Sequence, residues 1–348
     1  MKIVEQLEQL IAIESVTGNE KNILDYIENI LKSNNFDGEI LRNKGGIIAL
    51  PKNSSKTIAL VGHVDTVPIV IDQKLEFDDN DIIPGRGSVD MKGGIAVILN
   101  LLNTSPEHIV GVFYTAEEGP YENNGLTDLM PILLEECELS FSIILEPTDN
   151  EIQLGCLGVL NAKLTIDGKA GHSARPWVGD NPIYKMNKII EIVKENEIKE
   201  LIIDDLNFKQ VMSLTKVSSG IANNVIPDSL TLNLNFRYSP EIDGESATKL
   251  INELFSQYAT VEISNFSDGA MPNLSSLRIK NFVETINKVS TPKQAWTDIA
   301  RFYEMNIPSV NFGPGDPLLA HSADEHLSKI QLLESYELIY KYLKSINE

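Results

Sequence analysis

Side chains that can bind a metal ion follow several apolar stretches of this sequence. The run "TIALVGH" ends on a histidine, "VFYTAEE" ends on two adjacent glutamates, and "FSIILEP" carries a glutamate near its end. A further histidine lies in the loop after "PSVNF", and an aspartate lies in the glycine-rich segment "GRGSVDMKGG". In an open α/β sheet, ligands bind beyond the carboxyl ends of the strands. The candidate ligands are His63, Asp90, Glu117, Glu118, Glu146 and His321.

These candidates predict a metal site because so many carboxylates repel one another when they converge. Cations or protons must then neutralise them. Oxygen and imidazole ligands without a thiolate suit zinc, cobalt or manganese. Five ligands that include one shared carboxylate are enough for two ions about 3.5 to 4 Å apart. We therefore expect two divalent metal ions.

The adjacent glutamates Glu117 and Glu118 predict hydrolytic chemistry. One of them would bind metal, and its neighbour would take a proton from water, whose pKa a metal ion can lower to about 7. Asp65 lies two residues after His63 and could accept the second ring N–H of that histidine, which would fix the tautomer of the ligand. The residues therefore favour metal-assisted hydrolysis.

Apolar runs that alternate with helix-like segments predict a largely parallel sheet to position these ligands. The strand candidates are "GIIAL", "TIALVGH", "IVGVFYTAEE" and "FSIILEP", and "GGIAVILNLLNTS" has the length and periodicity of a helix. Before them, "TGNEKNILDYIENILKSN" predicts an amphipathic helix in which Thr17 and Glu20 form a capping box.

The pattern changes near residue 158. From there to about residue 268 the order is strand, helix, strand, strand, helix, strand, which predicts a βαββαβ unit with its own sheet. A helix-then-strand pattern returns afterwards and ends in a closing helix. We therefore expect an α/β fold in which residues 1–157 and 269–348 form a catalytic domain and residues 158–268 form an inserted α+β domain.

Composition excludes several classes of protein. The chain has 348 residues, of which 42% are hydrophobic and 23% charged, and it has no apolar run near the ~20 residues of a membrane span. Its start, "MKIVEQLEQL", lacks the features of a signal peptide, so we expect a cytoplasmic protein. The formal net charge of −21 disfavours nucleic acid as a partner. Cys137 and Cys156 have no ligand spacing and are expected to be ordinary thiols.

The segments "GHVDTVP", "GRGSVDMKGG", "TAEEG", "LEPT" and "GKAGHSARPW" together resemble the M20 family of dimetal peptidases and deacylases. The resemblance spans nearly the whole chain. It implies a zinc-peptidase-like catalytic domain and a ferredoxin-like lid domain that also forms a dimer. It further implies His63 and Glu146 on different metal ions, Asp90 as the bridge between the ions, and Glu118 and His321 as the remaining ligands.

Other roles also follow from the resemblance rather than from spacing. It implies that Glu117 is the general base and that Asp65 is the partner of His63. It also implies that the peptide bond after Asp90 is cis, although the next residue is not a proline.

A narrower resemblance rests on "GCLGVL", "HSARPWVGDNPIYKM", "NVIPD", "WTDIARF" and "NFGPGDPLLAH". Together these segments are similar to the succinyl-diaminopimelate desuccinylases of the actinobacterial type. Such enzymes remove succinate from N-succinyl-LL-2,6-diaminopimelate in bacterial lysine synthesis. The resemblance thus implies a small anionic amide as substrate and a homodimer formed through the lid domain.

Candidate substrate contacts lie mostly in the inserted domain. His172 lies in the turn-rich "AGHSA" and could donate to a developing oxyanion, and the resemblance implies that it does so across the dimer. Arg237 ends a predicted strand and could bind a substrate carboxylate, although a salt bridge at a sheet edge explains it equally well. Asn224, Arg175 and Thr297 are further candidates that also have structural interpretations.

Other functions stay open at this stage. The nearest is a related deacylase that acts on N-acetylornithine or on lysine held by a carrier protein, and a di- or tripeptidase is chemically similar. A carrier should need a basic docking patch, and the sequence has no clustered run of Lys and Arg. A catalytically inactive dimerisation module is a different class, which the retention of Glu117 and of every ligand disfavours.

Overall fold

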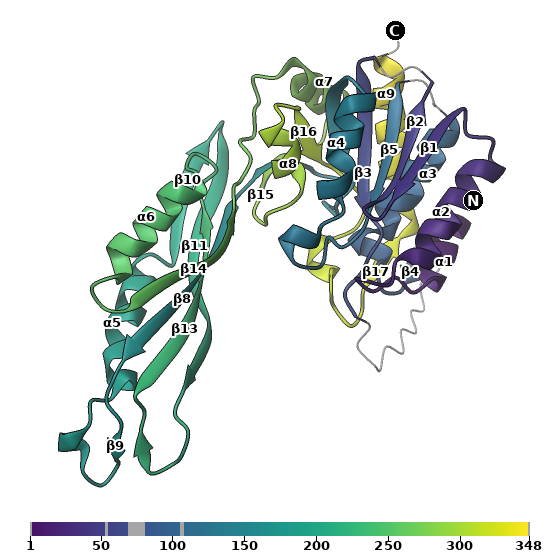
Figure 1. Ribbon diagram of the computed structural model, residues 1–348. Helices are drawn as coiled ribbons and strands as arrows, with labels where there is room; N and C mark the ends of the chain where they lie inside the picture. The colour runs from purple at the N-terminus through teal and green to yellow at the C-terminus, as the bar shows by residue number, and fades with distance from the viewer. Residues whose placement is uncertain (1, 53–54, 69–80, 105–107, 347–348) are drawn as a thin grey trace. The chain divides into compact units, whose positions relative to one another are not determined.

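The computed structural model describes residues 2–52, 55–68, 81–104 and 108–346. The chain forms two compact units (Figure 1). The first comprises Met1–Leu154, Asn273–Thr291 and Arg301–Glu348, and the second comprises Gly155–Pro272 and Pro292–Ala300. The insertion expected at residues 158–268 lies within the second unit, which also includes a short later segment.

An eight-stranded sheet forms the centre of the first unit, in the order β1-β2-β5-β3-β6-β16-β7-β15. Its four central strands run parallel to one another. They are β5 (Ile109–Tyr114), β3 (Thr57–His63), β6 (Leu139–Ile144) and β16 (Ser309–Asn311). The flanking strands are β1 (Gly38–Asn43), β2 (Gly46–Pro51), β7 (Ile152–Cys156) and β15 (Ser290–Lys293). The predicted parallel sheet is confirmed at its centre. The strands beside this centre, β2 and β7, pair antiparallel with it.

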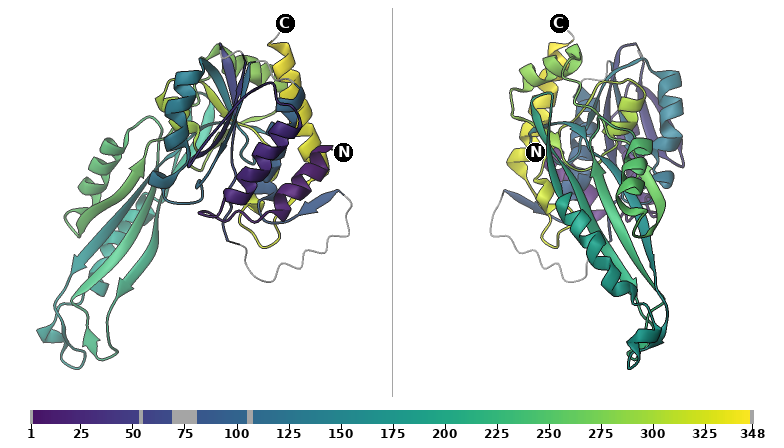
Figure 2. Two further views of the ribbon diagram at one scale, coloured as in Figure 1. Left: turned by 45° about the vertical axis from the view of Figure 1, so that its right-hand side comes forward. Right: turned by 90° about the vertical axis from the view of Figure 1, so that its left-hand side faces the viewer.

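Helices bury both faces of this sheet. Every residue of β3 and β5 is buried, which explains why their sequences are apolar runs rather than alternating patterns. Figures 1 and 2 show α4 on the opposite face of the sheet from α3 and α9. The helices of this unit are α1 (Lys2–Ala12), α2 (Lys21–Ser33), α3 (Gly93–Thr104), α4 (Leu126–Glu136), α7 (Leu277–Ile286) and α9 (Lys329–Ser345).

The parallel central strands bring the candidate ligands to one edge of the sheet. His63 is the last residue of β3, Glu117 and Glu118 follow β5, and Glu146 follows β6. The loop after β16 carries His321. Parallel strands have their carboxyl ends at the same edge, so the expected convergence of these residues follows from the topology.

Two short strands join the remaining loops of this edge. The strand β4 (Ile82–Pro84) precedes Asp90, and β17 (His326–Ser328) follows His321. They pair antiparallel, with Leu327 opposite Ile83. The segment that carries Asp90 is thereby held beside the segment that carries His321, although the two are far apart in sequence.

The second unit contains a five-stranded antiparallel sheet in the order β10-β11-β13-β8-β14. Residues alternate between buried and less buried along β8 and β13, as expected for a sheet with one covered face. The buried side chains form one core with α5 and α6, which lie on the same face (Figure 1). The elements are β8 (Gly158–Asp167), α5 (Pro182–Glu195), β10 (Ile198–Ile203), β11 (Leu206–Ser219), β13 (Ser229–Tyr238), α6 (Gly244–Phe255) and β14 (Thr260–Ser267).

The predicted βαββαβ order is confirmed, with β10 as an added edge strand. Sequence reasoning missed β10 because its residues are mostly exposed and show no alternation. Beyond the sheet, β9 (Gly171–His172) and β12 (Val225–Ile226) pair as a two-stranded ribbon. The short helix α8 (Ile299–Glu304) begins at the end of the segment Pro292–Ala300.

Two further expectations concern the whole chain. Cys137 and Cys156 are free and buried, which confirms two ordinary thiols. Burial raises the pKa of the Cys156 thiol to about 11, so this thiol is protonated and inert at neutral pH. Among the residues that the structure describes, no helix combines the length and apolarity that a membrane span requires.

The first turn of α3 packs so tightly against the sheet that a methyl group should not fit at Gly94. A Cβ atom there would lie 2.5 Å from the carbonyl oxygen of Leu145 and 2.9 Å from Cε of Met91. We expect Gly94→Ala to lower the free energy of unfolding by about 1–3 kcal/mol, measured by urea denaturation. Asn103→Ala, at an exposed position of the same helix, is the matched control and should change it by less than about 0.5 kcal/mol. Equal effects of the two substitutions would contradict tight packing at Gly94.

Candidate metal centre

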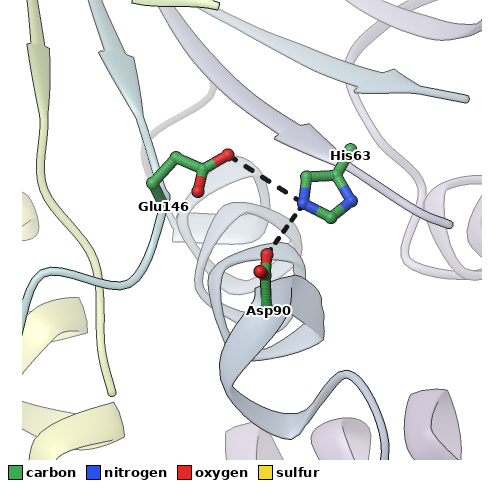
Figure 3. A group of neighbouring side chains, drawn as sticks. All are labelled: His63, Asp90 and Glu146. Carbon is green, nitrogen blue, oxygen red and sulfur yellow. Dashed lines mark hydrogen bonds and ion pairs between the residues drawn. The ribbon is translucent and has the colours of Figure 1, made fainter. Parts of the chain in front are cut away.

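The ring of His63 lies at the centre of the first group of ligands. Its Nε2 atom is 2.9 Å from Oδ1 of Asp90 and 3.9 Å from Oε1 of Glu146 (Figure 3). Ligand atoms of these three residues all lie within 4.8 Å of one another, so the group could hold one metal ion. His63 is almost completely buried, so its position is set by the packing of β3.

This grouping corrects one expectation about the ligands. The resemblance implied that His63 and Glu146 bind different ions. In the structure His63 ends β3 and Glu146 follows the adjacent parallel strand β6, and both face the same point beside Asp90. The geometry therefore favours His63 and Glu146 on the same ion.

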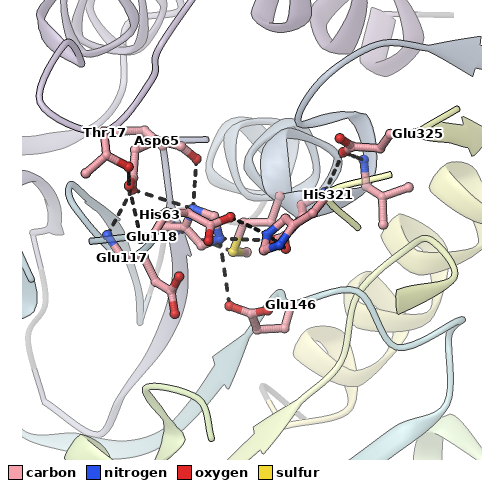
Figure 4. Close-up of polar contacts among 12 residues, drawn as sticks. Thr17, His63, Asp65, Glu117, Glu118, Glu146, His321 and Glu325 are labelled. Carbon is pink, nitrogen blue, oxygen red and sulfur yellow. Dashed lines mark hydrogen bonds and ion pairs between the residues drawn. The ribbon is translucent and has the colours of Figure 1, made fainter. Parts of the chain in front are cut away.

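A second group consists of Asp90, Glu118 and His321. The Nε2 atom of His321 is 2.7 Å from Oε1 of Glu118 and 3.4 Å from Oδ2 of Asp90 (Figure 4). The two oxygens of Asp90 thus face different histidines, Oδ1 toward His63 and Oδ2 toward His321. A carboxylate in this position can be shared between two ions, as expected for Asp90.

The electrostatics of both groups fit a cation. The hydrogen bonds of His321 to Asp90 and Glu118 raise its pKa to about 10. Burial alone would lower the pKa of His63, but the hydrogen bond to Asp90 and the charges of Asp90, Glu117 and Asp65 outweigh burial and raise it well above its usual value. Burial would likewise raise the pKa of Asp90, yet its hydrogen bonds to the two histidines lower it. The carboxylates therefore create a negative field in which a divalent ion would displace the histidine protons.

Glu117 lies beside both groups. It forms a third set of neighbouring ligand atoms with His63 and Glu118, within 4.8 Å. Its backbone turns away from β5 at Ala116, whose φ of 56° is left-handed and uncommon for a residue with a side chain. This turn lets the two adjacent glutamates point to different positions of one site.

Asp65 organises this turn more directly than the sequence indicated. Its Oδ1 accepts the backbone N–H of Glu117 at 3.0 Å, and its Oδ2 accepts that of Glu118 at 3.1 Å (Figure 4). The ring Nδ1 of His63 is 3.0 Å from the backbone carbonyl of Asp65 and 3.6 Å from its Oδ1. Asp65 therefore orients His63 mainly through its carbonyl, while its carboxylate holds the glutamate pair.

Sequence reasoning assigned Thr17 a different role, and that expectation is wrong. The Thr17 hydroxyl donates to Oδ2 of Asp65 at 2.8 Å rather than capping a helix (Figure 4). The helix α2 begins at Lys21, and Glu20 precedes it without a side-chain cap. Thr17 reaches Asp65 because the backbone beside it pairs with Thr66. The sequence carries no signal for a contact between segments this far apart.

The peptide bond between Asp90 and Met91 is cis, as the resemblance implied. Asp90 itself lies in the short turn η1 (Ser88–Lys92), directly before α3.

Three predicted lid residues meet on the β9–β12 ribbon of the second unit. His172 pairs with Val225, and the backbone N–H of Ser173 donates to the carbonyl of Asn224 at 2.9 Å. The N–H of Arg175 donates to the carbonyl of His172 at 2.8 Å. All three candidates, His172, Asn224 and Arg175, are exposed.

The imidazole of His172 has a defined tautomer. The backbone N–H of Ala174 donates to its Nδ1 at 3.1 Å, so a neutral ring carries its proton on Nε2. The exposed ring can therefore donate a hydrogen bond outward, as an oxyanion donor must.

Arg237 lies at the opposite end of the second unit's sheet. It is on the central strand β13, and its Nε donates to Oδ1 of Asn235 at 3.3 Å. Burial lowers the pKa of its half-buried guanidinium, and no carboxylate among the described residues lies within salt-bridge distance of it. The described part of the chain therefore does not support the alternative of a salt bridge at a sheet edge, since β13 is an interior strand. Nearby, the carbonyl of the buried Thr297 accepts from Sγ of Cys156 at 3.8 Å.

The chain is similar to known proteins in sequence and in fold. Residues 154–263 match a family model described as "Peptidase dimerisation domain". The chain is 34% identical over 345 residues to a "Putative succinyl-diaminopimelate desuccinylase" of Mycobacterium tuberculosis, covering 98% of this chain and 97% of the relative. It is also 34% identical over 352 residues to the succinyl-diaminopimelate desuccinylase of Corynebacterium glutamicum, covering 97% and 94%. Among solved structures, a tripeptidase of Staphylococcus aureus shares the fold with a TM-score of 0.79 at 18% identity, covering 99% of this chain and 98% of that one.

The two carboxylate hydrogen bonds of Asp65 predict that Asp65→Asn weakens metal binding. An amide has one oxygen, so one of the backbone N–H groups of Glu117 and Glu118 would face an NH₂ group. We expect the affinity for an ion at the group Asp90, Glu118 and His321 to fall about 10–100-fold, measured by competition with a chelator, because Asp65 holds the backbone of Glu118. Thr17→Val removes only the hydroxyl that contacts Asp65 and should cause a smaller loss. Metal affinity of Asp65→Asn equal to that of the unsubstituted protein would contradict this role.

Proposed function

The chain belongs to the M20 family, and on that premise we propose that it hydrolyses the amide bond of N-succinyl-LL-2,6-diaminopimelate. The products are succinate and LL-2,6-diaminopimelate, in the cytoplasmic synthesis of lysine. The observation that carries the proposal is the similarity to two desuccinylases over nearly the whole chain, at 34% identity in each case. The convergence of the candidate ligands at one sheet edge supports the same class of reaction.

Two divalent ions, most simply zinc, fit the donor set of this site, and cobalt or manganese would also suit it. His63, Asp90 and Glu146 would hold one ion, and Asp90, Glu118 and His321 would hold the other. When bound, such ions lower the pKa of water and polarise the substrate carbonyl. The ligand set contains no thiolate, and this distinguishes it from structural zinc sites rich in cysteine.

Glu117 is the proposed general base. It lies beside both ligand groups, while its neighbour Glu118 contacts His321. Glu117 takes a proton from the attacking water as the new C–O bond forms. It then gives that proton to the departing amine as the C–N bond breaks, so the carboxylate is regenerated. The fixed turn after β5 keeps this side chain oriented throughout.

Arg237 is the proposed anchor for a carboxylate of the substrate. Its half-buried guanidinium lacks an anionic partner among the described residues, and a substrate carboxylate would supply one. The bound ions and Arg237 would oppose the overall net charge of −21 at the site. An acidic protein can in this way bind an acidic substrate. Asn224, Arg175 and Thr297 are proposed as further substrate contacts.

The proposed roles of His172 and Arg237 require two copies of the chain. Along β13, Arg237 lies eight positions after Ser229, which is at the ribbon end of the sheet. At roughly 3.3 Å per residue, the two ends are about 26 Å apart, which is longer than a small amide. If both residues contact one substrate, they come from different copies. This agrees with the match of this unit to a peptidase dimerisation domain, and we propose a homodimer in which His172 donates to the oxyanion in the partner's site.

Steady-state hydrolysis of several substrates tests the proposal. With zinc present, we expect kcat/KM for N-succinyl-LL-2,6-diaminopimelate to exceed that for N-acetylornithine and for di- and tripeptides by orders of magnitude. The reason is that a site built for charged groups strongly rejects substrates that leave those groups unpaired. Chelator treatment should abolish the activity and zinc should restore it. A preference for another substrate would overturn the assignment to lysine synthesis, and activity without metal would overturn the mechanism.

The assignment of Glu117 predicts that Glu117→Gln loses turnover and keeps its metal. Glutamine has nearly the same shape but cannot accept the proton, so kcat should fall at least about 10²–10⁴-fold. Metal content, measured by inductively coupled plasma mass spectrometry, should stay the same. Glu122→Gln, at an exposed position shortly after Glu117, is the matched control and should leave kcat unchanged. Retained activity in Glu117→Gln would assign the base to another residue.

A further inference from the structure

A buried ion pair that no proposed catalytic role uses lies beside the metal ligands. Nη1 of Arg86 is 2.6 Å from Oε2 of Glu325, and the two residues are only 6% and 0% exposed. They are 239 positions apart in the sequence. Arg86 precedes the turn that carries Asp90, and Glu325 follows the loop residue His321. The pair therefore joins two ligand-bearing segments.

The second oxygen of Glu325 contacts the backbone of a ligand. Oε1 accepts the N–H of Val89 at 3.0 Å and that of Asp90 at 3.2 Å (Figure 4). These contacts fix the backbone at the residue whose side chain would be shared by both ions. The contact is made through the main chain, so the carboxylate of Asp90 is left for the site.

The other member of the pair reaches the second ligand segment. Nη2 of Arg86 donates to the carbonyl oxygen of His321 at 3.4 Å. The backbone N–H of Gly85 donates to the carbonyl of Glu325 at 3.0 Å, and the short strands β4 and β17 continue the contact between the segments. One guanidinium and one carboxylate thus contact the backbones of both Asp90 and His321.

Stability alone is a poor explanation for this pair. Removing two charges from water costs free energy that their mutual attraction often does not recover, so a buried ion pair is weak evidence for stability. Groups that orient metal ligands, in contrast, change metal affinity strongly even though they never touch the ion. This pair contacts the backbones of two proposed ligands, which matches a role in orienting metal ligands.

We propose that Arg86 and Glu325 are positioning residues that set the separation of Asp90 and His321 and so control the affinity of the ion that these two residues share with Glu118. This inference rests on the proposed dimetal site. The other ion depends less on the pair, because His63 ends β3 and Glu146 directly follows the adjacent strand β6. Asp90 and His321 lie in connecting segments and need a separate support.

Stepwise metal titration of the full chain tests this inference without using activity. The metal-free protein is titrated with Zn²⁺ against a chelating indicator to obtain two dissociation constants, and the visible absorption of the Co²⁺ form reports ligand geometry. The variants are Glu325→Gln and Arg86→Lys. Glutamine cannot accept from both backbone N–H groups and also pair with Arg86, while lysine keeps the charge but lacks the guanidinium fork.

A control variant separates positioning from general destabilisation. The buried hydroxyl of Ser335 in α9 donates to Oδ1 of Asn150, and neither residue is a proposed ligand or contacts Arg86 or Glu325. Ser335→Ala removes this hydrogen bond and should lower the midpoint of thermal unfolding without changing either dissociation constant. Because Arg86→Lys keeps a positive charge opposite Glu325, it provides a second test if Glu325→Gln does not fold.

In both site variants we expect the dissociation constant of the ion held by Asp90, Glu118 and His321 to rise about 10–100-fold. The dissociation constant of the other ion should change by much less, so the two constants should separate, and the Co²⁺ spectrum should shift. A lower unfolding midpoint with both constants and the spectrum unchanged would overturn the inference, as would equal weakening of the two ions.

The proposed function is tested by the unsubstituted protein, and the positioning role is tested by the variants. Unsubstituted protein that binds two ions but does not cleave the succinylated substrate would refute the function and leave the positioning role intact. A difference between variants and unsubstituted protein concerns only the positioning role.

Discussion

The convergence of carboxylates at one edge of the first unit's sheet is the constraint on which the rest of the site depends. Asp65, Glu117, Glu118 and Glu146 follow the carboxyl ends of parallel strands, and the segment before α3 adds Asp90 to them. Such a group is unfavourable unless positive charge neutralises it. The raised pKa values of His63 and His321 show how strongly these groups attract a cation. Metal ions resolve the repulsion, and the chemistry of the site follows from that.

The protein holds these residues by three different means. His63 ends β3, and Glu146 follows β6 by two residues, so the buried ends of these strands fix both. The pair Glu117 and Glu118 is fixed by hydrogen bonds from its own backbone to Asp65. Asp90 and His321 lie on connecting segments and are held by β4, β17 and a buried ion pair. Each ligand that lacks support from the sheet has a specific polar contact instead.

The sequence predicts the parts of this arrangement that depend on local pattern. Apolar runs located β3, β5 and β6, and the residues after them proved to be neighbours because parallel strands end together. It could not predict the contacts of Thr17, Arg86 or Glu325, because these depend on segments far apart in sequence. The grouping of His63 with Glu146 needed the order of strands in the sheet. The sequence did not indicate the edge strand β10, because most of its residues are exposed and buried and exposed positions do not alternate along it.

The position of β16 has a consequence for how the protein is made. This strand lies between β6 and β7 in the sheet, although the second unit's main segment, Gly155–Pro272, is synthesised before it. A nascent chain can complete that contiguous segment while the central sheet still lacks an interior strand. The loop that follows β16 also supplies His321. Closure of the sheet and completion of the second ligand group therefore depend on the same segment, and a growing chain has both only after β16 and the loop that carries His321 have been synthesised.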